Sequence, residues 1–547
     1  RHVLAGRGGQ NAIIYDSSIT GHKSTLTYTE LQQQTAKFAG MLADLGVVKG
    51  DRVIIYMPMI PQAVVAMLGC ARLGAIHSVV FGGFAAAELA KRIDDCTPKV
   101  MISASCGHEP GRIVEYKPLL DGAIETASHK PDHCVIVQRD ALAADLVAGR
   151  DLEWNAALDA ATELPPIPVK ATDPLYILYT SGTTGFPKGA QLTHRGSVAN
   201  ILNLVAMNMA SAMAEQKAIA AGDVPAPTGE PKAPLPPCFM APTPLFHVTA
   251  CNCILHAATA SGAKVVLMYK WDPGRALELI EREQVTSFSG VPTMSREMLL
   301  HPDWDKRDTS SVQGMGGGGA ALQPDLVHKI AGALKGGQPS TGYGMTETHG
   351  IITANAARLF IAKPESCGPL VPTLEGKLVD EDGNDLPAGP NTVGVLCVRG
   401  SIVIKGYLNR PEATADSIRD GWLNTGDIAR IDEDGFVYIV DRAKDMVIRG
   451  GENVYCSEVE TVIYNHDAIA EACVFGIPEE RLGEEVAAVI VLRPGRSLTE
   501  KELQEFLSGT IAKHKIPTKI WFRDEPIPRN ASGKFLKREL KKELTGE

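Results

Sequence analysis

The residues best suited to chemistry lie between positions 179 and 189, where hydroxyl side chains and one lysine alternate with glycines. The hydroxyl residues are Thr180, Ser181, Thr183 and Thr184, the glycines are Gly182, Gly185 and Gly189, and the lysine is Lys188. Glycine permits positive φ and a close approach of the backbone, so that N–H groups can converge on phosphate oxygens. The hydroxyls add donors and the lysine adds a positive charge. The segment therefore predicts a phosphate-handling loop.

Two other interpretations of this loop fit the sequence less well. An ordinary turn rich in Gly, Ser and Thr rarely carries so many donors followed by Pro-Lys-Gly. The Walker loop requires G-x-x-x-x-G-K-[ST], and this segment does not match it. The apolar run 175–179 just before the loop predicts a buried strand that leads into it.

On these residues the chain resembles the adenylate-forming superfamily, which comprises acyl-CoA synthetases, luciferases and the adenylation domains of peptide synthetases. Segment 179–189 resembles the family's signature loop. Further motifs follow in the family's order, at 240–247, 341–347, 424–427, 441–445 and 528–534. The resemblance covers nearly the whole chain and implies a ligase that uses ATP, Mg²⁺ and coenzyme A.

The resemblance implies a nucleotide site built from several of these motifs. Thr346 would contact the α-phosphate, Glu347 would hold Mg²⁺, and Lys534 would bridge the acid and the phosphate as the catalytic lysine, with His247 beside them. The implied ATP and AMP contacts are Thr180, Ser181, Gly182, Thr183, Thr184, Lys188, Gly318, Gly319, Ala320, Tyr343, Gly344, Asp427 and Arg442. A hard cation that bridges phosphates prefers carboxylate oxygen, which suits Glu347. Without the resemblance, an Asp that follows Gly, as Asp427 does, is most often a turn former.

The same resemblance places an acyl pocket at His247, Val248, Gly316, Gly317, Gly344 and Met345. Short-chain family members close this pocket with a tryptophan two residues before the Thr-Glu pair, where this chain has Gly344. Loss of an indole would open a deep channel, so we expect a medium- or long-chain acid. The first 180 residues nevertheless look like acetyl- and propionyl-CoA synthetases, so a short-chain acid is the alternative.

A coenzyme A site is implied in two places. Segment 76–116 resembles the part of short-chain acyl-CoA synthetases that holds the nucleotide end of coenzyme A, which nominates Gly82, Gly83 and Arg112. A solvated surface arginine is an equally good interpretation of Arg112. Gly450 and Gly451 match the family's loop beside the pantetheine tunnel.

The glycine run 314–319 formally satisfies the dinucleotide pattern G-x-G-x-x-G. That pattern needs a following helix and an acidic residue about 20 positions on, whereas Pro324 and Asp325 come too soon. A nicotinamide oxidoreductase is therefore the weaker alternative from another class. We expect these glycines instead to leave room for the adenine and the acyl group.

The pattern of elements predicts an α/β fold. Residues 25–104 alternate helical and strand-like segments, which favours a mostly parallel sheet covered by helices on both faces. With 547 residues the chain needs more than one domain. By resemblance, residues 1–440 form a large domain and residues 441–547 a small mobile α+β domain, with Lys444 at the hinge. Residues 211–237, rich in Ala and Pro, predict a long exposed loop.

The amino-acid composition limits the classes of partner and the cellular location that we expect. A net charge of −10 argues against nucleic acid as the main partner. Eleven scattered cysteines without a C-x-x-C pair are typical of reduced thiols, so we expect a cytoplasmic protein. No signal peptide is visible after Arg1, and the apolar run 63–87 contains Arg72 and His77, so we expect no integral membrane segment.

The sequence as a whole predicts an AMP-forming acyl-CoA synthetase. The expected partners are a carboxylic acid, ATP and coenzyme A, and a homodimer remains open. Within the class, the enzyme could instead deliver its acyl-AMP to a carrier protein.

Overall fold

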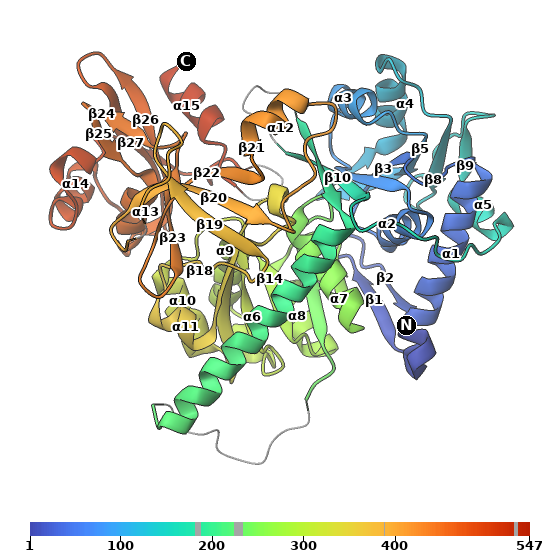
Figure 1. Cartoon of the computed structure of the whole chain (residues 1–547), viewed down its shortest axis with the longest axis horizontal. Coiled ribbons are helices and arrows are strands. Elements are labelled where there is room, and N and C mark those ends of the chain that lie inside the picture. Colours follow the sequence, from blue (N-terminus) through green and yellow to red (C-terminus); the bar gives the residue numbers. More distant parts are fainter. Residues whose placement is uncertain (181–186, 224–233, 388, 530–533, 547) are drawn as a thin grey trace.

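The computed structural model describes residues 1–180, 187–223, 234–387, 389–529 and 534–546. It has the predicted mixed α/β architecture, with a large N-terminal part built on two mainly parallel sheets and a smaller, mainly antiparallel C-terminal part (Figure 1).

The first large sheet contains residues from both ends of the N-terminal part. Its eight strands are, in spatial order, β17 (Thr353–Ala356), β16 (Gln338–Tyr343), β15 (Gly314–Gly318), β14 (Ser287–Gly290), β12 (Cys238–Ala241), β13 (Lys264–Met268), β1 (Asn11–Asp16) and β2 (Lys23–Thr27). The six inner strands are parallel, and the two edge strands are antiparallel to their neighbours. The helices around it include α8 (Pro273–Glu283), α9 (Pro292–Leu300), α10 (Pro324–Ala333) and α11 (Ala357–Ala362).

The second large sheet is the one predicted from residues 25–104. Its strands are, in order, β11 (Lys188–Thr193), β10 (Pro174–Thr180), β4 (Ile76–Phe81), β3 (Arg52–Met57), β5 (Val100–Ala104), β8 (His133–Val137) and β9 (Asp151–Glu153). Its helices are α1 (Tyr28–Asp44), α2 (Pro61–Leu73), α3 (Ala86–Cys96), α4 (Tyr116–Thr126) and α5 (Trp154–Ala160). The run Val53–Tyr56 is completely buried, as expected for a parallel strand covered on both faces.

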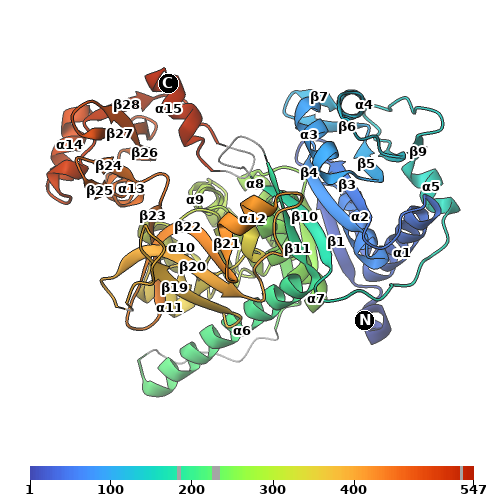
Figure 2. The ribbon, with the colours of Figure 1, turned by 45° about the horizontal axis from the view of Figure 1, so that its top comes forward.

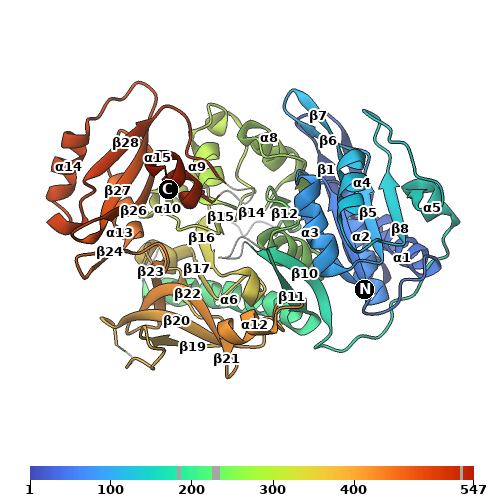
Figure 3. The same cartoon turned by 90° about the horizontal axis from the view of Figure 1, so that it is seen from above.

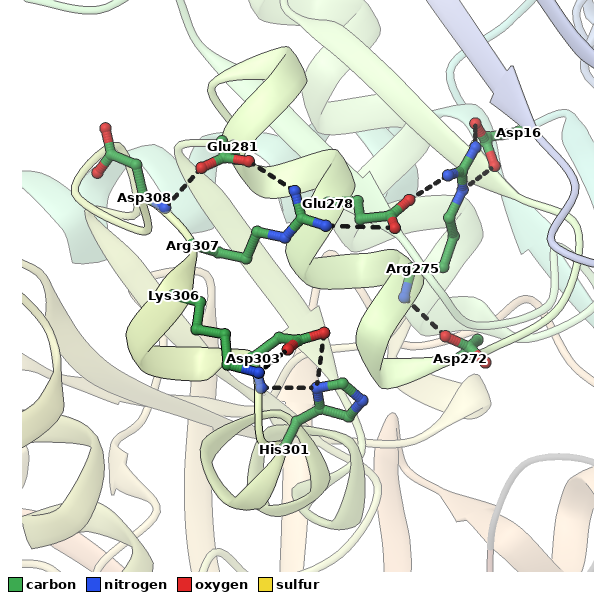
Figure 4. A network of polar contacts seen from close by, with 10 residues as sticks. All are labelled: Asp16, Asp272, Arg275, Glu278, Glu281, His301, Asp303, Lys306, Arg307 and Asp308. Atoms are coloured by element: carbon green, nitrogen blue, oxygen red, sulfur yellow. Dashed lines mark hydrogen bonds and ion pairs between the residues drawn. The ribbon is translucent and has the colours of Figure 1, made fainter.

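A buried ion-pair network fixes β1 to helix α8 (Figure 4). Arg275 donates from Nε and Nη2 to the two carboxylate oxygens of Asp16, at 2.7 and 2.8 Å. Burial alone would raise the pKa of Asp16, but Arg275 and Arg282 outweigh it and hold that pKa below the usual value. This ion pair thereby anchors the first strand of the chain to a helix residue 259 positions later in the sequence.

The remaining strands form two antiparallel sheets and a hairpin. The six-stranded sheet contains β18 (Gly368–Pro369), β23 (Phe436–Arg442), β22 (Trp422–Ile431), β20 (Val393–Gly400) and β19 (Leu374–Val379), with β21 (Ile418–Arg419) paired to β22. The C-terminal sheet contains β25 (Glu452–Val454), β24 (Val447–Arg449), β27 (Gly483–Leu492) and β26 (Ile469–Glu479), with β28 (Lys519–Arg523) parallel to β27. The hairpin is β6 (Cys106–Glu109) with β7 (Arg112–Glu115).

The C-terminal sheet carries helices α13 (Cys456–Tyr464), α14 (Glu500–Ser508) and α15 (Lys537–Thr545). Seen from above, this part lies on the opposite side of the molecule from the sheet that contains β3, and strands β14, β15 and β16 of the first large sheet lie between them (Figure 3).

The expected loop over residues 211–237 is wrong in its first part. Helix α6 (His194–Ala221) continues through residue 221 and ends at Gly222, whose φ is +80°. The Ala- and Met-rich composition of this stretch supports a helix, and its prolines occur only after the helix has ended. By length and composition alone α6 could cross a membrane, but the core helix of a globular protein can meet the same two criteria. One face of its first turns packs against the protein, where buried Asn203 donates to Thr373 Oγ1 at 2.7 Å.

Candidate active site

The signature loop begins and ends on neighbouring antiparallel strands. Thr180, the last residue of β10, lies opposite Lys188, the first residue of β11. The Nζ atom of Lys188 lies 5.2 Å from the ring centroid of Tyr407. The predicted contacts Ser181, Gly182, Thr183 and Thr184 lie outside the described residues. The two ends of the loop are thus fixed where a phosphate group would meet both a hydroxyl and a cation.

Glu347 is buried just after β16, and Tyr407 holds its carboxylate. The phenol of Tyr407 donates to Glu347 Oε1 at 2.8 Å, and the backbone N–H of Ile404 donates to the Glu347 carbonyl at 2.9 Å. Burial, and then the negative charge of Glu347, raises the pKa of Tyr407 above its usual value. The tyrosine therefore stays a neutral donor. Sequence analysis missed Tyr407, because its partner lies 60 residues away and no local motif marks it.

The segment that carries Tyr407 also pairs with β11. Leu408 N donates to Gly189 O at 2.8 Å, and Gln191 N donates to Gly406 O at 2.9 Å. This backbone pairing connects the strand of Lys188 directly to the residues that hold Glu347. The phosphate-loop lysine and the acidic residue are therefore parts of one hydrogen-bonded unit.

His349, which sequence analysis also missed, fixes the turn after Glu347. It is completely buried with φ +55°, and its Nδ1 donates to Ile402 O at 2.7 Å. Its Nε2 accepts the backbone N–H of Thr193 at 2.9 Å. Burial lowers the pKa of His349 to about 4, so at neutral pH the ring has the single tautomer that these two bonds require. His349 thereby connects Thr193, the N-cap residue of α6, to Ile402, which follows β20 of the six-stranded sheet.

A second polar group forms where β22 and β23 pair. Asp427 lies opposite Arg442 in the antiparallel register, and Arg442 Nε lies 3.2 Å from Asp427 Oδ1. Tyr343, at the end of β16, donates its phenol to Asp427 Oδ2 at 2.6 Å. Burial, followed by the nearby Asp427, raises the pKa of Tyr343 well above its usual value. Three predicted nucleotide contacts are thus brought together from motifs up to 99 positions apart in the numbering.

Lys534 comes from the C-terminal part of the chain and reaches this same centre. Burial lowers the pKa of its ammonium group, and the positive charge of Arg442 lowers it further, while Asp427 and Glu347 act in the opposite direction. Its charge also acts on His247, whose pKa burial and Lys534 together lower to about 4. His247 Nδ1 lies 3.1 Å from Thr249 Oγ1. The structure therefore brings Lys534 within electrostatic range of Glu347, Asp427, Arg442 and His247.

At three of the glycines that the sequence analysis places in the acyl pocket, the surrounding backbone leaves no room for a side chain. A Cβ on Gly316 would lie 1.7 Å from Ser340 O, and one on Gly317 would lie 1.8 Å from Gly290 O. A Cβ on Gly344 would lie 2.3 Å from Gly350 O and 2.8 Å from the Cα of Ile351. These glycines let strands and turns approach one another, and their assignment to the acyl pocket stays a prediction.

The other predicted residues of this region are placed as follows. Gly318 ends β15, and Gly319 (φ +85°) and Ala320 are exposed beyond it. Thr346 begins the short turn Thr346–Thr348 that contains Glu347. Val248 is buried in the core next to Gly350, and Met345 packs against the core that contains Ile351. The dinucleotide interpretation fails, because Gly314–Gly318 is a strand and not a turn before a helix.

A groove of about 270 Å³ is lined in part by Leu245 and Phe246, the two residues that precede His247 in the sequence. Its walls come from the carboxyl ends of β3, β4, β12 and β13, the edge at which open α/β sheets bind ligands. Most of its lining is apolar and includes Met57, Met59, Ala63, Val79, Leu245, Phe246, Trp271 and Met294. Its rim carries polar groups from the β6–β7 hairpin, among them Glu109, which forms an ion pair with Lys270.

The predicted coenzyme A residues do not all meet at this groove. Gly82 lines it, where a Cβ would lie 2.5 Å from the Tyr116 ring, and Gly83 is exposed just beyond β4. Arg112 is exposed at the start of β7. The turn Gly450–Gly451 lies in the C-terminal sheet, where Gly450 N donates to Leu482 O at 2.8 Å. Lys444 is exposed between β23 and β24.

Glu347 fits a magnesium ion that reaches the protein mainly through phosphate oxygens and water. No group of three His, Cys, Asp or Glu among the described residues could hold a metal ion alone. Mg²⁺ is commonly held by one or two carboxylates together with substrate phosphates. A single buried carboxylate beside Lys188 and Lys534 is consistent with that arrangement.

Comparison with known proteins agrees with this geometry. The family model described as AMP-binding enzyme matches residues 1–408, and that of the AMP-binding enzyme C-terminal domain matches residues 458–534. The chain is 34% identical to a feruloyl-CoA synthase of Amycolatopsis sp, covering 95% of this chain and 94% of that protein. It is 32% identical to a long-chain-fatty-acid–CoA ligase of Bacillus subtilis, covering 97% and 92%.

The fold is also that of a solved relative. The structure of ATP-bound MatB from Rhodopseudomonas palustris superposes with a TM-score of 0.79 at 28% identity, covering 98% of this chain and 96% of that one. The motif order, the site geometry and these likenesses agree. The chain therefore belongs to the AMP-binding enzymes, and it is an ATP-dependent acid–thiol ligase of the adenylate-forming superfamily that uses ATP, Mg²⁺ and coenzyme A.

Proposed function

We propose that the chain converts a carboxylic acid with a large apolar body into acyl-AMP and then into acyl-CoA. The observation that carries this proposal is the position of Lys534, because a buried ammonium from the C-terminal part acts on Glu347 and Asp427. In the first half-reaction a carboxylate oxygen attacks the α-phosphorus and pyrophosphate leaves. Negative charge is spread over phosphoryl oxygens, so positioning and positive charge matter more than proton transfer.

Each of the site residues would bind a different part of the substrates. Lys188, with Thr180 and the loop residues Ser181, Thr183 and Thr184, would bind the departing pyrophosphate. Thr346 would donate to the α-phosphate. Mg²⁺, when bound through Glu347, would neutralise phosphate charge. Lys534 would attract the acid's carboxylate and the α-phosphate to each other.

Asp427 is suited to the ribose. Its Oδ2 accepts from Tyr343 at 2.6 Å and its Oδ1 lies near Arg442, which leaves lone pairs on both oxygens for hydroxyl donors. Tyr343 is held in place through its phenol, so its ring is fixed beside the exposed residues Gly319 and Ala320 at the neighbouring strand end. This is where we place the adenine.

We propose that the second half-reaction requires rotation of the C-terminal part about Lys444. The chain leaves the six-stranded sheet after Arg442 and enters the C-terminal sheet at Val447, so few residues connect the two. Residues 1–440 and 441–547 would be the two domains. After rotation the Gly450–Gly451 turn would replace Lys534, while Gly82, Gly83 and Arg112 would bind coenzyme A. Such domain closures commonly gate ligase-type reactions.

The apolar groove lined by Leu245 and Phe246 supports a large acid. Its carboxyl-end position and apolar lining fit the body of a medium- or long-chain acid better than acetate. The relatives named above act on an aromatic and on a long-chain acid, and the chain is about equally similar to both. All eleven cysteines are free, which supports a reducing, cytoplasmic location.

An ATP–pyrophosphate exchange assay across straight-chain acids from acetate to palmitate, with ferulate and coumarate added, tests the substrate class. We expect little exchange with acetate and maximal exchange with acids long enough to fill the groove. Each buried methylene contributes about 0.8 kcal/mol, so several should change kcat/KM by orders of magnitude.

The variant Met59→Trp, which fills the groove, should shift the maximum toward shorter acids, while Val48→Trp on the surface should not. An unchanged profile in Met59→Trp would place the acid elsewhere. Thioester formation with coenzyme A, compared with a carrier protein as acceptor, identifies the thiol partner.

A further inference from the structure

Helix α6 carries an apolar stripe that nothing in the described part of the chain covers. The helix crosses the molecule diagonally, and its C-terminal half projects beyond the sheets (Figures 1 and 2). Five large apolar side chains along it are half exposed or more: Val198 (57%), Leu202 (60%), Val205 (50%), Met209 (60%) and Met213 (57%).

The spacing of these residues places them on one face. Successive members are four, three, four and four positions apart, which is the spacing of a helix seam. No charged residue occurs between Arg195 and Glu215. An exposed helix of a monomeric protein usually carries charges on its solvent face, so a continuous apolar stripe marks an interaction surface.

We propose that this stripe is the interface of a homodimer in which two copies of α6 pack antiparallel about a two-fold axis near Val205. The stripe is symmetric about the midpoint between residues 205 and 206. In an antiparallel pair Leu202 therefore meets Met209 of the second copy, Val198 meets Met213, and the two Val205 side chains flank the axis. A two-fold interface requires such a self-complementary surface.

The charge distribution agrees with this arrangement. The macrodipoles of two antiparallel helices oppose each other favourably, and no like charges face each other within the stripe. Five half-exposed side chains present on the order of 400 Å² per subunit, so pairing removes about 800 Å² in total, below a standard interface. We therefore expect a weak dimer whose population depends on protein concentration.

A membrane surface fits the same stripe less well. A helix that lies on a membrane is typically rich in Lys and Arg on its polar face, whereas α6 has none between Arg195 and Lys217. The net charge of −10 also opposes binding to anionic lipids. A second copy of the chain is therefore the favoured occupant.

Sedimentation velocity of the full chain over a wide concentration range tests the proposal. The parent should shift from monomer to dimer as concentration rises, and Leu202→Glu should weaken association by roughly tenfold or more. Leu300→Glu, at a 71% exposed position on α9, is the matched control and should associate like the parent. A parent that remains monomeric, or a dimer that Leu202→Glu leaves unchanged, would overturn the proposal.

A charge-pair rescue tests the antiparallel register itself. Residues 202 and 209 lie about 10 Å apart along one helix, too far to pair within a chain. In the proposed dimer Leu202→Glu combined with Met209→Lys creates two intermolecular ion pairs and should restore association. Leu202→Glu with Met209→Glu should not. Failure of the rescue, or stripe-dependent flotation with phosphatidylcholine or phosphatidylserine vesicles, would contradict the assignment.

Discussion

Single side chains in this site are held by partners that no motif reveals. Glu347 shows this most clearly, because Tyr407 fixes one carboxylate oxygen and leaves the other for a ligand. The tyrosine lies beside Lys188, so one residue orients the acidic group and borders the cation of the phosphate loop. Loss of either partner should therefore affect the metal requirement before it affects the fold.

Glu347→Gln should abolish most adenylation, and Tyr407→Phe should reduce it more moderately. An uncharged amide is a poor ligand for a hard cation, whereas the Phe variant keeps the carboxylate and loses only its orientation. We expect roughly tenfold loss for Tyr407→Phe, on the scale of about 1.4 kcal/mol. The measurement is the acid-dependent ATP–pyrophosphate exchange rate as a function of Mg²⁺ concentration. Identical Mg²⁺ dependence in parent and both variants would remove Glu347 from the metal site.

His349 makes the stability of the protein sensitive to acid. Its folded pKa of about 4 lies below the usual 6.5, so its contribution is fully present above pH 6.5 and is lost as pH falls toward 4. The linkage amounts to about 3 kcal/mol at most. Thermal melting of His349→Gln should therefore show a lower Tm at pH 7.5 and a smaller decrease in Tm between pH 6.5 and 5 than the parent. An equal pH dependence in both proteins would show that His349 does not titrate as described.

At the scale of elements, glycines set how closely strands approach. Gly344→Ala should destabilise the protein and reduce activity on short and long acids in parallel. The reason is that a Cβ there would meet the backbone of Gly350, and overpacking typically costs about 1–3 kcal/mol. Tm and the exchange profile across chain lengths check this. The control is Gly332→Ala on α10, where a Cβ would meet nothing within 4 Å. A change in chain-length preference without a loss of Tm would instead assign Gly344 to the acyl pocket.

Local patterns predicted elements well where the period was strong. The buried strand Val53–Tyr56 and the strand before the signature loop both formed as expected, because a continuous apolar run can only be satisfied inside a covered sheet. The predicted loop 211–237 begins instead with the last turns of helix α6, because the prolines of this stretch occur only after residue 221. The close backbone approach at Gly316 and Gly317 could not be predicted, since a sequence does not show which backbone a glycine faces.

At the scale of the whole molecule, the site depends on contacts between distant parts of the chain. Separate sequence motifs nominated Lys534, Glu347 and Asp427, and the family resemblance implied that these three residues meet. Tyr407 and His349 could not be predicted, because their roles follow from the pairing of β11 with residues 404–408 and not from any local pattern. The C-terminal part brings Lys534 within electrostatic range of Glu347 and Asp427, which is consistent with the adenylation that we propose.

The central claim is that Lys534 serves acyl-AMP formation and not thioester formation, and Lys534→Ala measured in both half-reactions tests it most directly. Removal of the ammonium should slow acid-dependent pyrophosphate exchange by roughly a hundredfold or more, on the scale of about 3 kcal/mol. The same variant given preformed acyl-AMP and coenzyme A should make thioester at nearly the parental rate. Lys537→Ala is not a suitable control, because Lys537 is ion-paired to Glu460, so Lys542→Ala at an exposed position serves instead. Equal losses in both half-reactions, or none in the first, would contradict the account.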